Sequence, residues 1–143
     1  MLKISKLLDY GLLVVVTIAK NSHSPYSAAN IAEVTDLNLP TVRKLLNLLS
    51  SKNIVASKRG TEGGYVLTKS AKSIKVLDIV KAVEDNVRIT ECCDRRTKGC
   101  SVIKKCTVHN YWKIMNKQVL EILSNTSVED IVNDNENNPN QLN

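Results

Sequence analysis

The first half of the chain shows a helical spacing of hydrophobic residues. Across residues 3–20, apolar side chains recur every three or four positions, which predicts a buried helix. After a polar break, Ser27 is placed to cap a short helix over 28–34. Pro40 then opens another helix that runs to about Ser51 and buries Val42, Leu45, Leu46 and Leu49. The pattern therefore predicts three helices joined by short turns.

Two short segments with strand-like composition follow the third helix. Residues 54–58 and 65–68 are typical of strands, and the connection between them, 59–64, contains three glycines. This arrangement predicts a β-hairpin. Two helices joined by a tight turn and followed by a hairpin indicate a winged helix-turn-helix. We therefore predict a mainly α fold with a small β-hairpin wing.

The second half of the chain is predicted to be helical at three places. Residues 73–83 form an amphipathic pattern, 107–123 a longer one, and 127–132 a short final turn of helix. Residues 133–143 contain six Asn and almost nothing apolar, which predicts a disordered tail.

The long helix over 107–123 has a wide apolar stripe. Ile114 and Leu120 extend this stripe beyond what one small domain needs to cover. We therefore predict that the helix pairs with its copy in a homodimer. The simpler alternative is that it covers only its own domain. The predicted interface residues are Tyr111, Trp112, Met115, Val119 and Ile122.

Positive charge is concentrated in the first half of the chain. Residues 1–70 contain nine Lys and Arg against four Asp and Glu, a net charge of +5, whereas residues 71–143 contain eleven against ten, a net charge of +1. A basic winged helix predicts binding to an operator in double-stranded DNA. The candidate contacts are Thr41, Arg43, Lys44 and Asn47 on the second helix of the motif, and Lys58 and Arg59 at the tip of the hairpin. The alternative is an ordinary solvated surface.

Several other classes of function find no support in the sequence. The longest apolar run, 12–16, is far shorter than the roughly 18 residues of a membrane span. We expect a cytoplasmic protein with no membrane partner, in which thiols stay reduced. No nucleotide-binding glycine motif and no acid–base constellation is present, so we expect neither an enzyme nor a small-molecule substrate.

All four cysteines fall in one short window that ends at a histidine. The spacing is Cys93-x6-Cys100-x5-Cys106-x2-His109, with Cys92 as an alternative first member. Thiols gathered in this way form disulfides, perform redox chemistry or bind a soft metal. A cytoplasmic location disfavours disulfides, and no CxxC redox pair is present. A metal is therefore favoured, and both zinc and an iron–sulfur cluster accept Cys and His ligands.

The sequence resembles the IscR/NsrR family of winged-helix regulators, which use iron–sulfur clusters to sense cluster supply, redox state or nitric oxide. The resemblance covers nearly the whole chain except the Asn-rich end. Its most specific parts are Arg59-Gly60 and Gly63-Gly64-Tyr65 in the wing, followed by Cys100, Cys106, His109 and Trp112 at matching separations.

The resemblance implies a homodimeric transcription regulator, most often a repressor, with one cluster per protomer. Its Cys106-x2-His109 ending matches the branch that binds a [2Fe–2S] cluster through three Cys and one His and regulates cluster-assembly genes. Asp9 lies where nitric-oxide-sensing relatives supply a carboxylate from the partner subunit, so a [4Fe–4S] cluster is the alternative. A zinc-binding or a purely thiol-based regulator also remains open.

We therefore divide the chain into four parts. They are a winged helix-turn-helix domain over 1–84, a cluster-binding loop over 85–106, a dimerisation helix with a short helix over 107–132, and a tail over 133–143.

Overall fold

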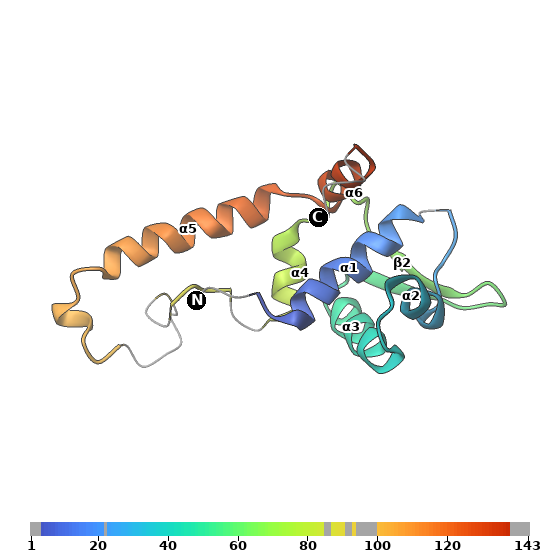
Figure 1. The fold of residues 1–143 in the computed structure, drawn as a ribbon, viewed down its shortest axis with the longest axis horizontal. Coiled ribbons are helices and arrows are strands. Elements are labelled where there is room, and N and C mark those ends of the chain that lie inside the picture. Colours follow the sequence, from blue (N-terminus) through green and yellow to red (C-terminus); the bar gives the residue numbers. More distant parts are fainter. Residues whose placement is uncertain (1–3, 22, 85–86, 91–92, 94–99, 138–143) are drawn as a thin grey trace.

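The predicted order of helices and hairpin is present in the computed structural model, which describes residues 4–21, 23–84, 87–90, 93 and 100–137. Figure 1 shows a compact body with two projections, the hairpin on one side and a long helical arm on the other. The elements in chain order are α1 (Lys6–Lys20), α2 (Ala28–Thr35), α3 (Leu39–Ser51), β1 (Val55–Lys58), β2 (Gly64–Leu67), α4 (Val76–Val83), the 3-10 helix η2 (Ile103–Lys105), α5 (His109–Asn125) and α6 (Val128–Asn137).

Helix α1 is the centre of the body. It contacts α2, α3, α4, α6 and strand β2. The β-branched run Val14-Val15-Val16 suits a strand locally, yet it is buried inside this helix because the longer helical period governs the segment. Gly11 allows α4 to approach, since a Cβ there would lie 3.0 Å from the side chain of Val83. Tertiary packing has therefore overridden the local strand preference of the valines.

The hairpin is antiparallel and pairs Val55 with Leu67 at its base and Lys58 with Gly64 near its tip. Its first residue faces the core, because Val55 is buried, and the next three positions of β1 are exposed. At the tip, Gly60 has φ +129°, a conformation that side chains disfavour, and the Gly63 amide donates to its carbonyl. Two of the three glycines predicted to form the turn, Gly60 and Gly63, therefore do so, whereas Gly64 is the first residue of β2.

The C-terminal helix departs from the sequence prediction. Helix α6 continues to Asn137, so the predicted disordered tail is wrong for residues 133–137, while 138–143 lie outside the described residues. A capping box explains its start, because the amide of Ser127 donates to Asp130 and the amide of Asp130 donates to Ser127. The Asn135 amide group donates to the carbonyl of Ile131, which supports the extra turn.

Helix α6 also belongs to the body rather than to the arm. Val128 is fully buried in the core, and Ile131 and Val132 pack against it. A backbone bridge between Lys75 and Ser127 attaches the start of the helix to the segment before α4. The sequence prediction grouped this helix with the dimerisation helix because nothing in its spacing shows which surface it covers.

Helices α1 and α4 also begin later than predicted. Helix α1 begins at Lys6 rather than at residue 3, because Ser5 caps it by accepting from the amide of Leu8. Helix α4 begins at Val76 rather than at residue 73. The carbonyl of Ile74 accepts from Val128, which keeps this stretch extended.

Candidate nucleic-acid interface and metal-ligand segment

Side-chain caps set the geometry of the helix-turn-helix. Ser27 accepts from the amide of Asn30 at the start of α2, and Asn38 accepts from the amide of Thr41 at the start of α3, at 2.9 Å. Between these helices Asp36 adopts the left-handed conformation with φ 57°, which ends α2 and turns the chain. The Asn38 cap and Pro40 together fix where α3 begins.

Helix α3 divides cleanly into a buried and an exposed face. The four apolar residues predicted to be buried, Val42, Leu45, Leu46 and Leu49, are all 0% exposed. Three of the four predicted base or phosphate contacts on this helix are exposed, and Thr41 in its first turn is half-buried. This arrangement presents donors and positive charge along one side of a rigid helix, which is what major-groove contact requires.

The hairpin is attached to the helix-turn-helix through its backbone. The amide of Tyr65 donates to the carbonyl of Tyr26 at 2.7 Å, and the amide of Tyr26 donates back at 3.2 Å. Gly64 is required beside this bridge, because a Cβ there would lie 2.5 Å from the carbonyl of Tyr26. Lys58 and Arg59 are both exposed near the tip. The wing is therefore held to the helix-turn-helix as one unit. The second helix of that motif, α3, is called the reading helix because it is the one predicted to contact base edges.

The described cysteines occupy turns between the body and α5. Cys93 follows a turn in which its amide donates to the carbonyl of Thr90, and its sulfur lies 3.3 Å from the hydroxyl of the same residue. The carbonyl of Cys100 accepts from the amide of Ile103, and Cys106 caps the end of η2. Cys93, Cys100 and Cys106 are all free thiols and all half-buried.

His109 is the first residue of α5 and has an unsatisfied ring nitrogen. Its Nδ1 atom is buried and has no hydrogen-bond partner. Such an atom is costly unless it binds a proton donor or a metal. Three free thiols and this imidazole fit a soft metal or an iron–sulfur cluster in chemical kind. Within the described part of the chain, however, no three potential ligands are gathered around one point.

The alternative ligands lie elsewhere. Cys92 lies outside the described residues. Asp9 is exposed in the first turn of α1, which belongs to the body. His109 is the first residue of α5, and the start of α5 is the end that lies away from the body (Figure 1). Among the described residues of one chain, Asp9 is not part of any group of three potential metal ligands.

Helix α5 contains no buried residue, although its sequence is apolar at regular positions. Tyr111 is 69% exposed and Ile122 is 65% exposed, and Val119 is also exposed. Trp112 and Met115 are half-buried and line a shallow groove with Tyr111. The predicted interface residues therefore lie on a helix that contacts α4 but that the described residues leave without a buried side chain.

Three structural contacts were missing from the sequence prediction. Asn38 was assigned to a turn, although an Asn two residues before a Pro is a recognisable helix cap. Neither the Tyr26–Tyr65 bridge nor the bond from the Ile89 amide to Asn116 has any local signal, because each joins residues far apart in the chain.

Fold and site together define a winged-helix DNA-binding protein with a cysteine-rich segment before a long helix. The chain belongs to the Rrf2 family, described as iron-dependent transcriptional regulators, whose model matches residues 4–134. This family consists of transcriptional regulators, which confirms that the chain is not an enzyme. In the described residues, no helix is long and apolar enough to cross a membrane.

Individual relatives agree with this assignment. The chain is 31% identical to the HTH-type transcriptional regulator IscR of Pectobacterium carotovorum over 128 residues, which cover 89% of this chain and 77% of the relative. The structure of CymR, the global cysteine regulator of B. subtilis, matches with a TM-score of 0.76 and 29% identity over 93% of this chain and 98% of that one. The structure of T. potens IscR also gives 0.76, with 27% identity over 99% and 94%.

Proposed function

We propose that this protein is a homodimeric cytoplasmic repressor whose binding to an operator depends on an iron–sulfur cluster. The three thiols Cys93, Cys100 and Cys106 would hold the cluster together with His109. The observation that carries this proposal is the buried and unpartnered Nδ1 of His109, three residues after a free thiol. Similarity to relatives named IscR supports the assignment. The proposed targets are cluster-assembly genes, as the resemblance of the Cys106-x2-His109 ending implies.

The ligand set favours a [2Fe–2S] cluster over a [4Fe–4S] cluster. A bound cluster supplies a redox-active group that oxidants or nitric oxide can alter. The residues of this chain would transmit a change in the cluster to the DNA-binding domain, because the proposed ligands lie on the segment that joins the body to α5. Loss or oxidation of the cluster would change the conformation of residues 92–106. That change would alter the angle of α5, and through α5 the spacing of the two reading helices in a dimer.

Spectroscopy on protein purified without air tests the cluster. The expected result is a coloured protein with iron and sulfide in equal amounts, whose visible absorption changes in His109→Ala and not in Asp9→Ala. The reverse pattern would favour the [4Fe–4S] alternative with a carboxylate from the partner subunit. A colourless protein with stoichiometric zinc would reject both.

A thiol-based switch is a second candidate. The similarity to CymR structures, one of them an oxidised form of the Staphylococcus aureus protein, supports it, as do three free thiols in one segment. In this case a disulfide within the segment would replace the cluster as the signal. Mass spectrometry of the oxidised protein would detect that bridge, and operator binding would respond to peroxide in protein that contains no iron.

A further inference from the structure

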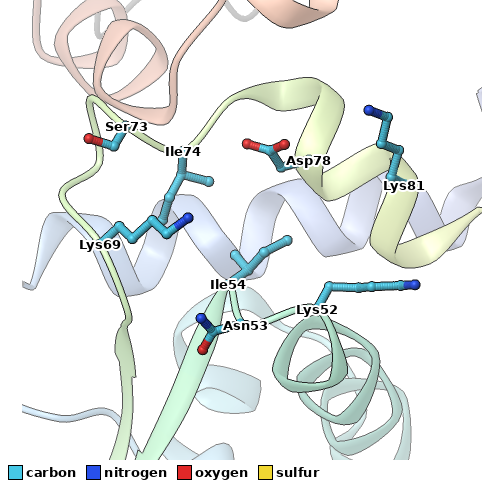
Figure 2. A pocket seen from close by; sticks show the side chains of 8 residues that line it. All are labelled: Lys52, Asn53, Ile54, Lys69, Ser73, Ile74, Asp78 and Lys81. Atoms are coloured by element: carbon cyan, nitrogen blue, oxygen red, sulfur yellow. The ribbon is translucent and has the colours of Figure 1, made fainter.

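A cleft lies at the base of the hairpin, at the end opposite its tip. Its volume is about 230 Å³. Figure 2 shows that its walls come from three elements: the end of α3 with the start of β1, the segment that leaves β2, and the first turns of α4. Ile54 and Ile74, 4% and 2% exposed, form an apolar floor. None of the proposed cluster ligands or DNA contacts lines this cleft.

The polar lining of the cleft is strongly positive. Lys52, Lys69 and Lys81 line it, one from each wall, against a single carboxylate, Asp78 (Figure 2). One oxygen of Asp78 already accepts from the amide of Lys75 at 3.0 Å, where it caps α4. Across the described residues, none of the three lysines is in an ion pair, in contrast to Lys117, whose Nζ lies 3.6 Å from Glu121.

The position of the cleft argues against contact with DNA. Lys52 follows the last residue of α3, about 16 Å along the helix from Thr41 at a rise of 1.5 Å per residue. Ile54 is at the base of the hairpin, about 13 Å from Lys58 at 3.3 Å per strand residue. Lys52 and Lys69 are therefore placed at the far ends of the two elements that are predicted to contact DNA, and Lys81 lies on α4, which is not predicted to contact DNA.

We propose that this cleft binds a small organic anion that carries a phosphate group. Three ammonium groups and one carboxylate give a net charge of +2, which matches a phosphate monoester dianion, and lysine is a common phosphate ligand. The volume is below the roughly 300 Å³ of pockets that hold drug-sized ligands, so the organic part is small. That part rests on Ile54 and Ile74. A bound ligand would connect the reading helix, the wing and α4.

Titration of the 15N-labelled full chain with glycerol 3-phosphate tests the proposal, with sodium chloride at equal ionic strength as the reference. We expect saturable shifts in the amides that surround the cleft. The triple variant Lys52→Gln, Lys69→Gln, Lys81→Gln should bind at least about tenfold more weakly, because it removes all three positive charges that would attract the phosphate. The matched control Lys20→Gln, Lys113→Gln, Lys117→Gln removes the same charge from exposed positions elsewhere and should bind as the wild type does.

The Asp78→Asn variant is expected to raise the affinity for glycerol 3-phosphate, whereas the triple lysine variant lowers it. The amide oxygen can still cap α4, while the charge that repels an anion is gone, so binding should become tighter. Shifts that do not saturate, or equal affinity in the two triple variants, would overturn the proposal. It would also be overturned if the cleft variant lost more operator affinity than the control and had a shallower salt dependence, because the cleft would then contact DNA.

Discussion

The body and the arm of this protein are built in different ways. Every buried side chain in the described part of the chain belongs to the body, and none belongs to α5. The body closes its own core with residues from five helices, α1 to α4 and α6, and from the hairpin. The arm, helix α5, leaves Tyr111, Ile114 and Ile122 more than half exposed. The body is therefore specified by its own sequence, whereas the arm presents the apolar surface that we propose a second subunit covers.

Truncation of a core residue gives the largest expected effect. Leu46→Ala should lower the free energy of unfolding by about 2–5 kcal/mol, because Leu46 is fully buried and its loss leaves a cavity. Ile122→Ala should cost less than about 0.5 kcal/mol at protein concentrations where the chain is monomeric, because its side chain is 65% exposed.

Urea unfolding at several protein concentrations distinguishes the two variants. The Leu46→Ala effect should be independent of concentration. The Ile122→Ala effect should grow with concentration, because it reports on the proposed dimer. If Ile122→Ala were as costly as Leu46→Ala at every concentration, the contrast between body and arm would be wrong.

A charge on the exposed stripe of α5 gives the next largest effect. Ile122→Glu should weaken self-association by about 100-fold or more, because a carboxylate would be buried without a partner in the proposed interface. Sedimentation velocity measures this shift. Lys113→Glu is the control, since residue 113 lies on the opposite side of the helix from Tyr111 and is exposed. Equal association of both variants with the wild type would show that the dimer forms elsewhere.

Removal of one positive charge from the wing gives a smaller effect. Arg59→Ala should weaken operator binding several-fold and reduce the slope of log affinity against log salt by about 0.9, the value for one phosphate contact. Fluorescence anisotropy at a series of salt concentrations measures both quantities. Lys20→Ala removes an exposed charge from the last turn of α1 and is the control. An unchanged slope in Arg59→Ala would remove the wing from the DNA interface.

The body could be predicted from the sequence because its signals are local. The four buried residues of α3 were identified from spacing alone, and the glycines at 60, 63 and 64 predicted the hairpin. The main error in the prediction of the body was the end of α6. Asn-rich composition indicated disorder there, but a capping box at Ser127 and the bond from Asn135 to Ile131 extend the helix. Local composition cannot show that this helix packs on α1.

The metal-ligand segment is a different case. Its residues were identified by type and spacing, and the structure shows three of the thiols free and His109 with an orphaned nitrogen. Their assembly around a metal depends on atoms that do not belong to the chain, and Cys92 lies outside the described residues. The spacing of the residues therefore identifies the candidate ligands. It does not distinguish among a [2Fe–2S] cluster, a [4Fe–4S] cluster, a zinc ion and a disulfide. Only the bound group makes that choice.

The smallest expected effect concerns the junction where α6 joins the body. Hydrogen bonds from the side chain and then the backbone of Ser127 hold the pKa of the Asp130 carboxyl below its ordinary value of 3.8. A group whose pKa is lower in the folded state stabilises the fold above its unfolded pKa, and this stabilisation is lost as the pH falls through the folded value.

Asp130→Asn should therefore be slightly less stable than the wild type at pH 7, and the gap should narrow as the pH falls below 3.8. Urea midpoints between pH 7 and pH 2.5 measure the gap. Asp134 is exposed and lies one turn further along α6. The urea midpoint of Asp134→Asn should therefore differ less from that of the wild type, and the difference should change less with pH. A gap for Asp130→Asn that stayed constant down to pH 2.5 would mean that the cap acts through the geometry of the side chain. The charge at the start of α6 would then contribute nothing to its attachment to the body.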